Sequence, residues 1–159
     1  MMGAPHFRHG RGFSIVEALV ALVVLSVGML GIAALYVESL RAGRTAVYRT
    51  QAVNLAADMA DRIRANRTAP NWALPAGAAP TTHNCVNGGV ICTPNQLAEE
   101  DQATWLDTIR NQLPGNGVNT ANGTIDVDAL ASPPQYQITV SWFEPGEAQA
   151  LTYVLTMQT

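Results

Sequence analysis

An apolar run near the N-terminus limits the possible folds more than any other feature of this sequence. From Ala18 to Val37 the chain carries almost no polar side chain. Twenty residues of α-helix are about the length needed to cross the ~30 Å hydrocarbon layer of a bilayer. The run is too long for the apolar core of a secretory signal, and no small-residue cleavage site follows it. The sequence therefore predicts a retained membrane helix.

A single carboxylate, Glu17, stands immediately before this run. A charge costs about 2.5–3.5 kcal/mol at the centre of a membrane helix and less near its ends. One interpretation is that Glu17 reaches water at the membrane surface. The other is that it pairs with a cation. Cleavage between Gly12 and Phe13 would create an α-ammonium four residues away, on this chain or on a neighbouring copy.

The segment GFSIVE (residues 12–17) has a basic start before it, with Arg8 and Arg11, and the apolar run after it. This arrangement resembles the type IV prepilin signature. In that family a dedicated peptidase cuts after the glycine on the cytoplasmic side and methylates the new N-terminal residue. The resemblance implies that residues 1–12 are a cleaved leader and that Phe13 becomes N-methylated. It also implies that Glu17 pairs with the N-terminal amine of an adjacent subunit during filament assembly.

The residues after the leader favour one long helix, because no proline occurs between Pro5 and Pro70. We predict a stem helix over residues 13–67, with 13–37 in the membrane or filament core and 38–67 amphipathic. One apolar face recurs at helical spacing, and its members are Ala52, Leu55, Met59 and Ile63. Gly28 and Gly31 are the weak points of the membrane half, each costing about 1 kcal/mol relative to alanine.

Two further segments narrow the resemblance. QAVNLAADMADRIRANR (51–67) is similar to the end of the stem helix in PilV-type minor pilins. NCVNGGVICTPNQLAEEDQATWLDTIRNQLPGNG (84–117) resembles the cysteine loop and the tryptophan-bearing helix of the same subfamily. The resemblance implies an α+β, ladle-like fold: a long N-terminal membrane-spanning helix, a small antiparallel sheet packed on it, and one short additional helix. Residues 68–159 would form the periplasmic head.

The head contains one helix pattern and three strand patterns. Thr93, Pro94 and Gln96 form a capping box that predicts a helix over about 94–113, whose expected buried stripe is Leu97, Trp105, Ile109 and Leu113. Alternating residues predict strands at about 124–130, 135–143 and 149–157. Such strands form an antiparallel sheet with one apolar face, which we expect to rest on the C-terminal half of the stem.

Two cysteines, Cys85 and Cys92, lie in the loop before this helix. If the head is outside the cytoplasm, a disulfide between them is the natural interpretation. The alternative is a metal site that adds His83. That set supplies only three ligands and matches no standard zinc spacing.

Charge is divided unevenly along the chain. There is no lysine, and after Arg67 a single arginine stands against eight acids, a formal net charge of −7. This part of the chain would repel phosphates, so we expect no nucleic acid partner. The sequence also contains no P-loop, Gly-x-Ser-x-Gly or His-Glu-x-x-His motif. We therefore expect no enzyme activity, no catalytic residue, no metal and no cofactor.

The resemblance implies a PilV-type minor pilin, anchored in the inner membrane with a cytoplasmic N-terminus and later carried on the surface pilus. Its expected partners are other minor and major pilins, prepilin peptidase, the inner-membrane pilus assembly machinery and membrane lipid. One alternative is a minor pseudopilin of a type II secretion system, which shares this N-terminus. An alternative of another class is a membrane-anchored periplasmic enzyme or binding domain, for which the leader would stay uncut.

Overall fold

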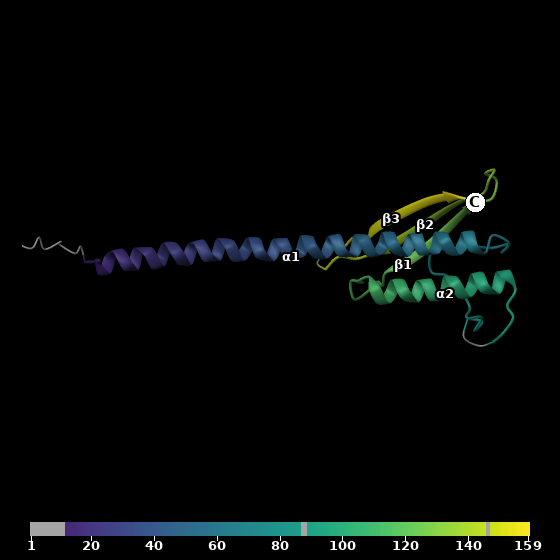
Figure 1. The fold of residues 1–159 in the computed structure, drawn as a ribbon, viewed down its shortest axis with the longest axis horizontal. Coiled ribbons are helices and arrows are strands. Elements are labelled where there is room, and N and C mark those ends of the chain that lie inside the picture. Colours follow the sequence, from purple (N-terminus) through teal and green to yellow (C-terminus); the bar gives the residue numbers. More distant parts are fainter. Residues whose placement is uncertain (1–11, 87–88, 146) are drawn as a thin grey trace, which may run out of the picture. The chain divides into compact units, whose positions relative to one another are not determined.

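The computed structural model of the chain describes residues 12–86, 89–145 and 147–159. All of the predicted leader except Gly12 therefore lies outside the described residues. The element order is α1 (Ile15–Ala65), α2 (Pro94–Gln112), β1 (Asn122–Asp128), β2 (Gln135–Trp142) and β3 (Leu151–Gln158) (Figure 1). The predicted α+β class, with a long first helix, a shorter second helix and a three-stranded sheet, is confirmed. The chain divides into two units after Gly43.

The first unit contains the apolar part of α1. The helix continues without interruption through Gly28 and Gly31, and neither glycine has a neighbouring atom within 4 Å of the place where a Cβ would stand. Among the described residues, α1 is the one helix with the length and apolar composition to cross a membrane.

The second unit begins at Arg44 and contains a hydrophobic core that α1, α2 and the sheet share. Ala52, Leu55, Met59 and Ile63 are all buried in it, which confirms the predicted face of α1. The side chain of Trp72, from the loop after α1, is also buried. One continuous hydrophobic core therefore holds α1, α2 and the sheet of this unit together.

The capping box predicted at the start of α2 is present. The Thr93 hydroxyl accepts the Gln96 backbone N–H, and the Gln96 side chain accepts the Thr93 backbone N–H. The buried stripe differs from the prediction at one end, because Leu97 is only half-buried and Ala98 is fully buried. Consecutive helix residues point about 100° apart, so Leu97 lies beside the buried stripe. The small Ala98 side chain occupies the stripe itself.

The sheet has the strand order β1-β2-β3, and both pairings are antiparallel. The first strand starts two residues earlier than predicted and ends at Asp128. It ends there because the Asp128 carboxylate accepts the backbone N–H groups of Leu130 and Ala131 and so starts a turn. The third strand is displaced by one or two residues from its predicted bounds. Between β2 and β3, the Glu147 N–H donates to the Glu144 carbonyl over 3.0 Å.

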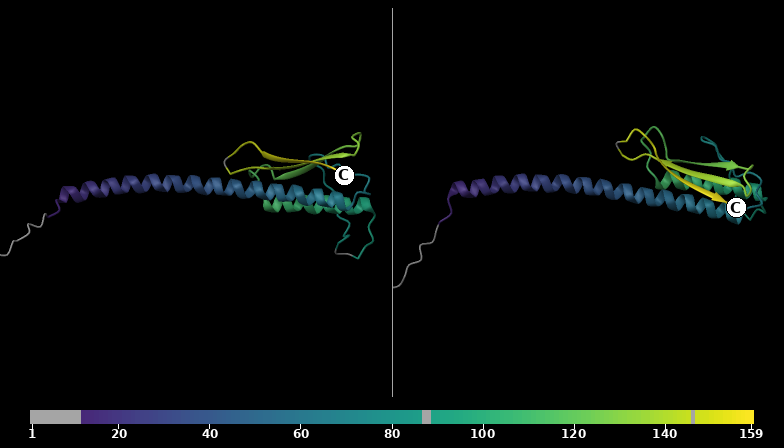
Figure 2. Two further views of the ribbon diagram at one scale, coloured as in Figure 1. Left: turned by 45° about the horizontal axis from the view of Figure 1, so that its top comes forward. Right: turned by 90° about the horizontal axis from the view of Figure 1, so that it is seen from above.

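One face of the sheet covers both α2 and the part of α1 that follows Arg44 (Figure 2). The expected contact with the C-terminal half of the stem is present, and the sheet also covers Trp105 of α2, which is fully buried. Its indole N–H donates to the Leu55 carbonyl of α1 over 2.8 Å. A Cβ on Gly123 of β1 would lie 2.4 Å from the Trp105 ring. Trp105 is therefore in contact with all three layers.

Candidate assembly site on the N-terminal helix

The predicted cleavage junction precedes the first helix. Gly12 and Phe13 are exposed and have no helical hydrogen bond, and 80% of the Phe13 surface is accessible. The first helical turn is closed by the Ala18 N–H, which donates to the Ser14 carbonyl over 3.2 Å. An exposed peptide bond outside regular structure is the form that proteases cut most readily.

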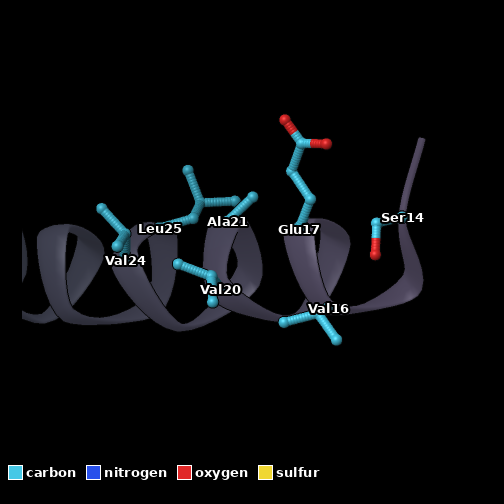
Figure 3. A pocket seen from close by; sticks show the side chains of 7 residues that line it. All are labelled: Ser14, Val16, Glu17, Val20, Ala21, Val24 and Leu25. Carbon is cyan, nitrogen blue, oxygen red and sulfur yellow. The ribbon is translucent and has the colours of Figure 1, made fainter. Parts of the chain in front are cut away.

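Glu17 lies in the first turn of α1. Its carboxylate extends away from the helix on the side that also carries Ala21, while Val16 points the opposite way in this view (Figure 3). Within the described ranges no cation comes within 4 Å of this carboxylate. An acid in the first turn is favoured by the helix dipole by about 0.3–1 kcal/mol. The helix dipole stabilises the Glu17 carboxylate slightly, but it does not replace a paired cation.

An extended apolar surface surrounds this carboxylate. Each large apolar residue from Ile15 to Leu40 has between 53% and 81% of its surface exposed. Glu17 is the sole charged residue between Ile15 and Val37. Exposed apolar area of this extent marks a membrane or protein contact, since water-soluble monomers rarely carry patches above a few hundred Å².

In the second unit, the two predicted cysteine ligands are joined to each other. Cys85 and Cys92 form a disulfide, so neither sulfur is a free thiolate for the metal alternative. The third residue of that alternative, His83, has its Nε2 2.6 Å from a Glu99 carboxylate oxygen. The cysteine loop is thus a structural feature of the head.

Sequence reasoning missed the role of the acids at the start of α2. The Glu100 carboxylate accepts the backbone N–H groups of His83 and Asn84, the latter over 3.0 Å. With the contact between Glu99 and His83, these bonds attach the base of the cysteine loop to α2. The one signal for them in the sequence was the cluster of acids Glu99, Glu100 and Asp101 on the predicted helix.

Arg62 joins α1 to α2. Its guanidinium lies 2.9 Å from Asp58, one turn earlier on α1, and 2.6 Å from Asp101 of α2. Burial alone lowers the pKa of Arg62, but the hydrogen bonds to Asp101 and Asp58 outweigh burial and raise the pKa overall. Arg62 therefore stays charged at every physiological pH.

Comparison with known families bears on both units. Residues 7–33 match the family model of the prokaryotic N-terminal methylation motif, and residues 34–103 match that of type IV pilin Tt1218. Searches of curated proteins and of solved structures gave no match. The first model covers 27 and the second 70 of the 159 residues. Members of this family are structural subunits that interact with other pilins and with prepilin peptidase. Together the two matches support a type IV pilin with a prepilin-type N-terminus.

Proposed function

We propose that this pilin is a minor pilin of the PilV type that takes part in starting or extending the pilus. Prepilin peptidase cuts it between Gly12 and Phe13, and Phe13 becomes the methylated N-terminal residue. The mature chain then joins neighbouring subunits through α1. The observation that carries this proposal is the exposed apolar surface of residues 15–40, with Glu17 as the single charge in its first part.

The same surface serves two successive environments. In the inner membrane, lipid covers the apolar side chains, and Glu17 lies close enough to the end of the span to reach the head groups. In the filament, the apolar surfaces of other stem helices replace lipid. Since lipid and apolar side chains are equally apolar, this exchange gains little free energy by itself.

Glu17 supplies the specificity that apolar contact lacks. A carboxylate moved away from water is costly unless it meets a cation. The amine of a cleaved neighbour is such a cation, and the pair forms at one axial position of the two helices only. The pairing therefore favours correct register and selects subunits whose leader has been removed.

The PilV assignment within the family rests on the similarity of residues 51–67 and 84–117 to that subfamily. Its partners are other minor pilins, the major pilin and the inner-membrane assembly machinery. The head is placed in the periplasm before assembly, where a disulfide such as that of Cys85 and Cys92 persists.

The deciding experiment is the intact mass of the protein from membranes and from sheared surface filaments. We expect a chain that lacks residues 1–12 and carries one extra methyl group, in both fractions. Processed protein in the membrane fraction alone would favour a minor pseudopilin or a purely priming role. An unprocessed chain in both fractions would contradict the proposal and favour a membrane-anchored domain of another function.

A further inference from the structure

The two edges of the sheet are not equivalent. At the outer edge of β1, Leu74 and Ile125 exchange two backbone hydrogen bonds of 2.9 and 3.0 Å, which close that edge locally. At the other edge, β3 pairs with β2 alone (Figure 2). In the described part of the chain, no other backbone segment pairs with β3. Its outward N–H and C=O groups are therefore open to another strand.

The third strand also lacks the features that normally protect an edge. Proteins guard exposed edges with lysines, prolines, bulges or very short strands. Leu151–Gln158 is eight residues long and contains no charge and no proline. Thr152, Val154 and Thr156 are exposed. An unguarded edge of this kind either promotes aggregation or serves for binding.

A groove runs beside the start of this edge. It has a volume of about 400 Å³ and lies between α1 and the sheet, with the lining residues Arg49, Val53, Trp142, Leu151, Thr152 and Tyr153. Arg49 is exposed and forms no ion pair within the described ranges. The Trp142 indole N–H is buried and lacks an acceptor among the described residues. The groove thus offers one cation, Arg49, which suits an anionic segment.

We propose that β3 and this groove bind an extended segment of a different pilin, which adds a fourth strand to the sheet and places a carboxylate beside Arg49. Main-chain hydrogen bonds to β3 would supply the affinity, and Arg49 would supply selectivity for the acid. A second copy of this chain fits less well. Its own open strand has no acid, and the acids of β1 lie on a strand that already pairs with β2. The inference uses the family assignment but neither cleavage nor Glu17.

The first test measures the binding of synthetic strands to the full-length protein in detergent by fluorescence anisotropy. The reference peptide is an octapeptide of alternating valine and threonine with blocked ends and one glutamate. Two versions carry the glutamate near either end, since antiparallel and parallel addition bring opposite ends to Arg49. Matched peptides carry lysine in place of glutamate, or prolines at two central positions.

We expect the better glutamate peptide to bind about two- to fivefold more tightly than its lysine counterpart, the range of an exposed ion pair. The proline peptide should lose binding because it cannot form the ladder of hydrogen bonds. Arg49→Gln should abolish the preference for glutamate while leaving the proline effect intact. Equal binding of the glutamate and proline peptides would overturn strand addition, and an unchanged preference in Arg49→Gln would overturn the role of the groove.

Disulfide trapping locates the site. Cys85 and Cys92 are bonded to each other, so a cysteine introduced at Val154 is available to a peptide that carries a cysteine at a threonine position. Thr104→Cys on α2 is the control, since this residue is also exposed. Preferential trapping at position 154 supports the proposal, and equal trapping at both positions contradicts it.

In piliated cells, a photoreactive residue at Thr152 identifies the natural occupant by the mass of the cross-linked product. A product with another pilin supports the proposal, and a product with a second copy of this chain contradicts it. Because the peptide experiment uses unassembled protein, it can succeed even if Glu17 has no role in assembly. The two proposals therefore fail separately.

Discussion

Among single residues, Glu17 bears most directly on function. It is the sole charge in the first half of an exposed apolar helix surface, and no partner for it is found among the described residues. A helix that only had to stay in the membrane would lose nothing if this residue were apolar. The carboxylate therefore points to a later step, in which a cation arrives from another molecule.

We predict that Glu17→Ala leaves membrane insertion unchanged, or slightly favours it, and lowers incorporation into filaments at least tenfold. The variant keeps the apolar surface but loses the charge that selects a neighbouring amine. Quantitative immunoblots of membrane and sheared-filament fractions measure both quantities. Glu17→Gln is the matched control for shape, and it should fail like the alanine variant. Normal incorporation of Glu17→Gln would falsify the charge-pairing mechanism.

Gly123 illustrates a residue whose role depends on a distant neighbour. A Cβ at this position would lie 2.4 Å from one Trp105 ring atom and 2.8 Å from the Ile109 side chain. Trp105 cannot easily retreat, since it is fully buried and its N–H is bonded to the Leu55 carbonyl. The glycine is thus required by close packing of β1 on α2.

We predict that Gly123→Ala lowers the free energy of unfolding of the head by about 1–3 kcal/mol, the usual cost of overpacking a core. Thermal unfolding of the full chain in detergent, followed by near-UV circular dichroism of the tryptophans, measures this change. Gly43→Ala is the control, because that glycine lies in α1 with open space around it. It should leave stability unchanged or raise it by up to about 1 kcal/mol. A neutral Gly123→Ala would show that β1 moves away from Trp105 at little cost.

At the scale of elements, the contacts between α1 and α2 show what the sequence could and could not predict. Periodicity located the buried face of α1, and the capping box located the start of α2, because both are properties of neighbouring residues. The partner of Arg62 on α2 was not predictable, since Asp101 lies 39 residues away and reaches it through the tertiary fold alone. The same holds for Trp105, whose contacts with α1 and β1 depend on the packing of three layers.

The two carboxylates that bind Arg62 should contribute unequally. Asp58 lies on the same helix and is half exposed, whereas only 14% of the Asp101 side chain is exposed. We predict that Asp101→Ala lowers the free energy of unfolding by about 1–2 kcal/mol, because it removes a charged hydrogen bond between elements. Asp58→Ala should cost about 0.5 kcal/mol or less. Chemical denaturation of both variants makes the comparison, and equal losses would show that Arg62 does not join the helices energetically.

At the scale of the whole molecule, the sequence predicted the prepilin-type N-terminus and the number of strands better than the exact bounds of each strand. The apolar run and the GFSIVE segment pointed to a prepilin-type N-terminus, and a family model for that motif covers residues 7–33. The strand patterns predicted three strands, although β1 and β3 are displaced by about two residues at their ends. Strand ends depend on turn contacts such as those of Asp128, which alternation of apolar residues does not reveal.

The disulfide between Cys85 and Cys92 also bears on how a pilus carries load. The two cysteines are seven residues apart, so the bond removes only about 24 Å of extensible chain. No disulfide between described residues attaches the sheet to α1. Under a pulling force the head would therefore yield through its core and its hydrogen bonds, and nearly its entire contour length would be released. Its mechanical strength depends on packing around residues such as Trp105 rather than on a covalent bond.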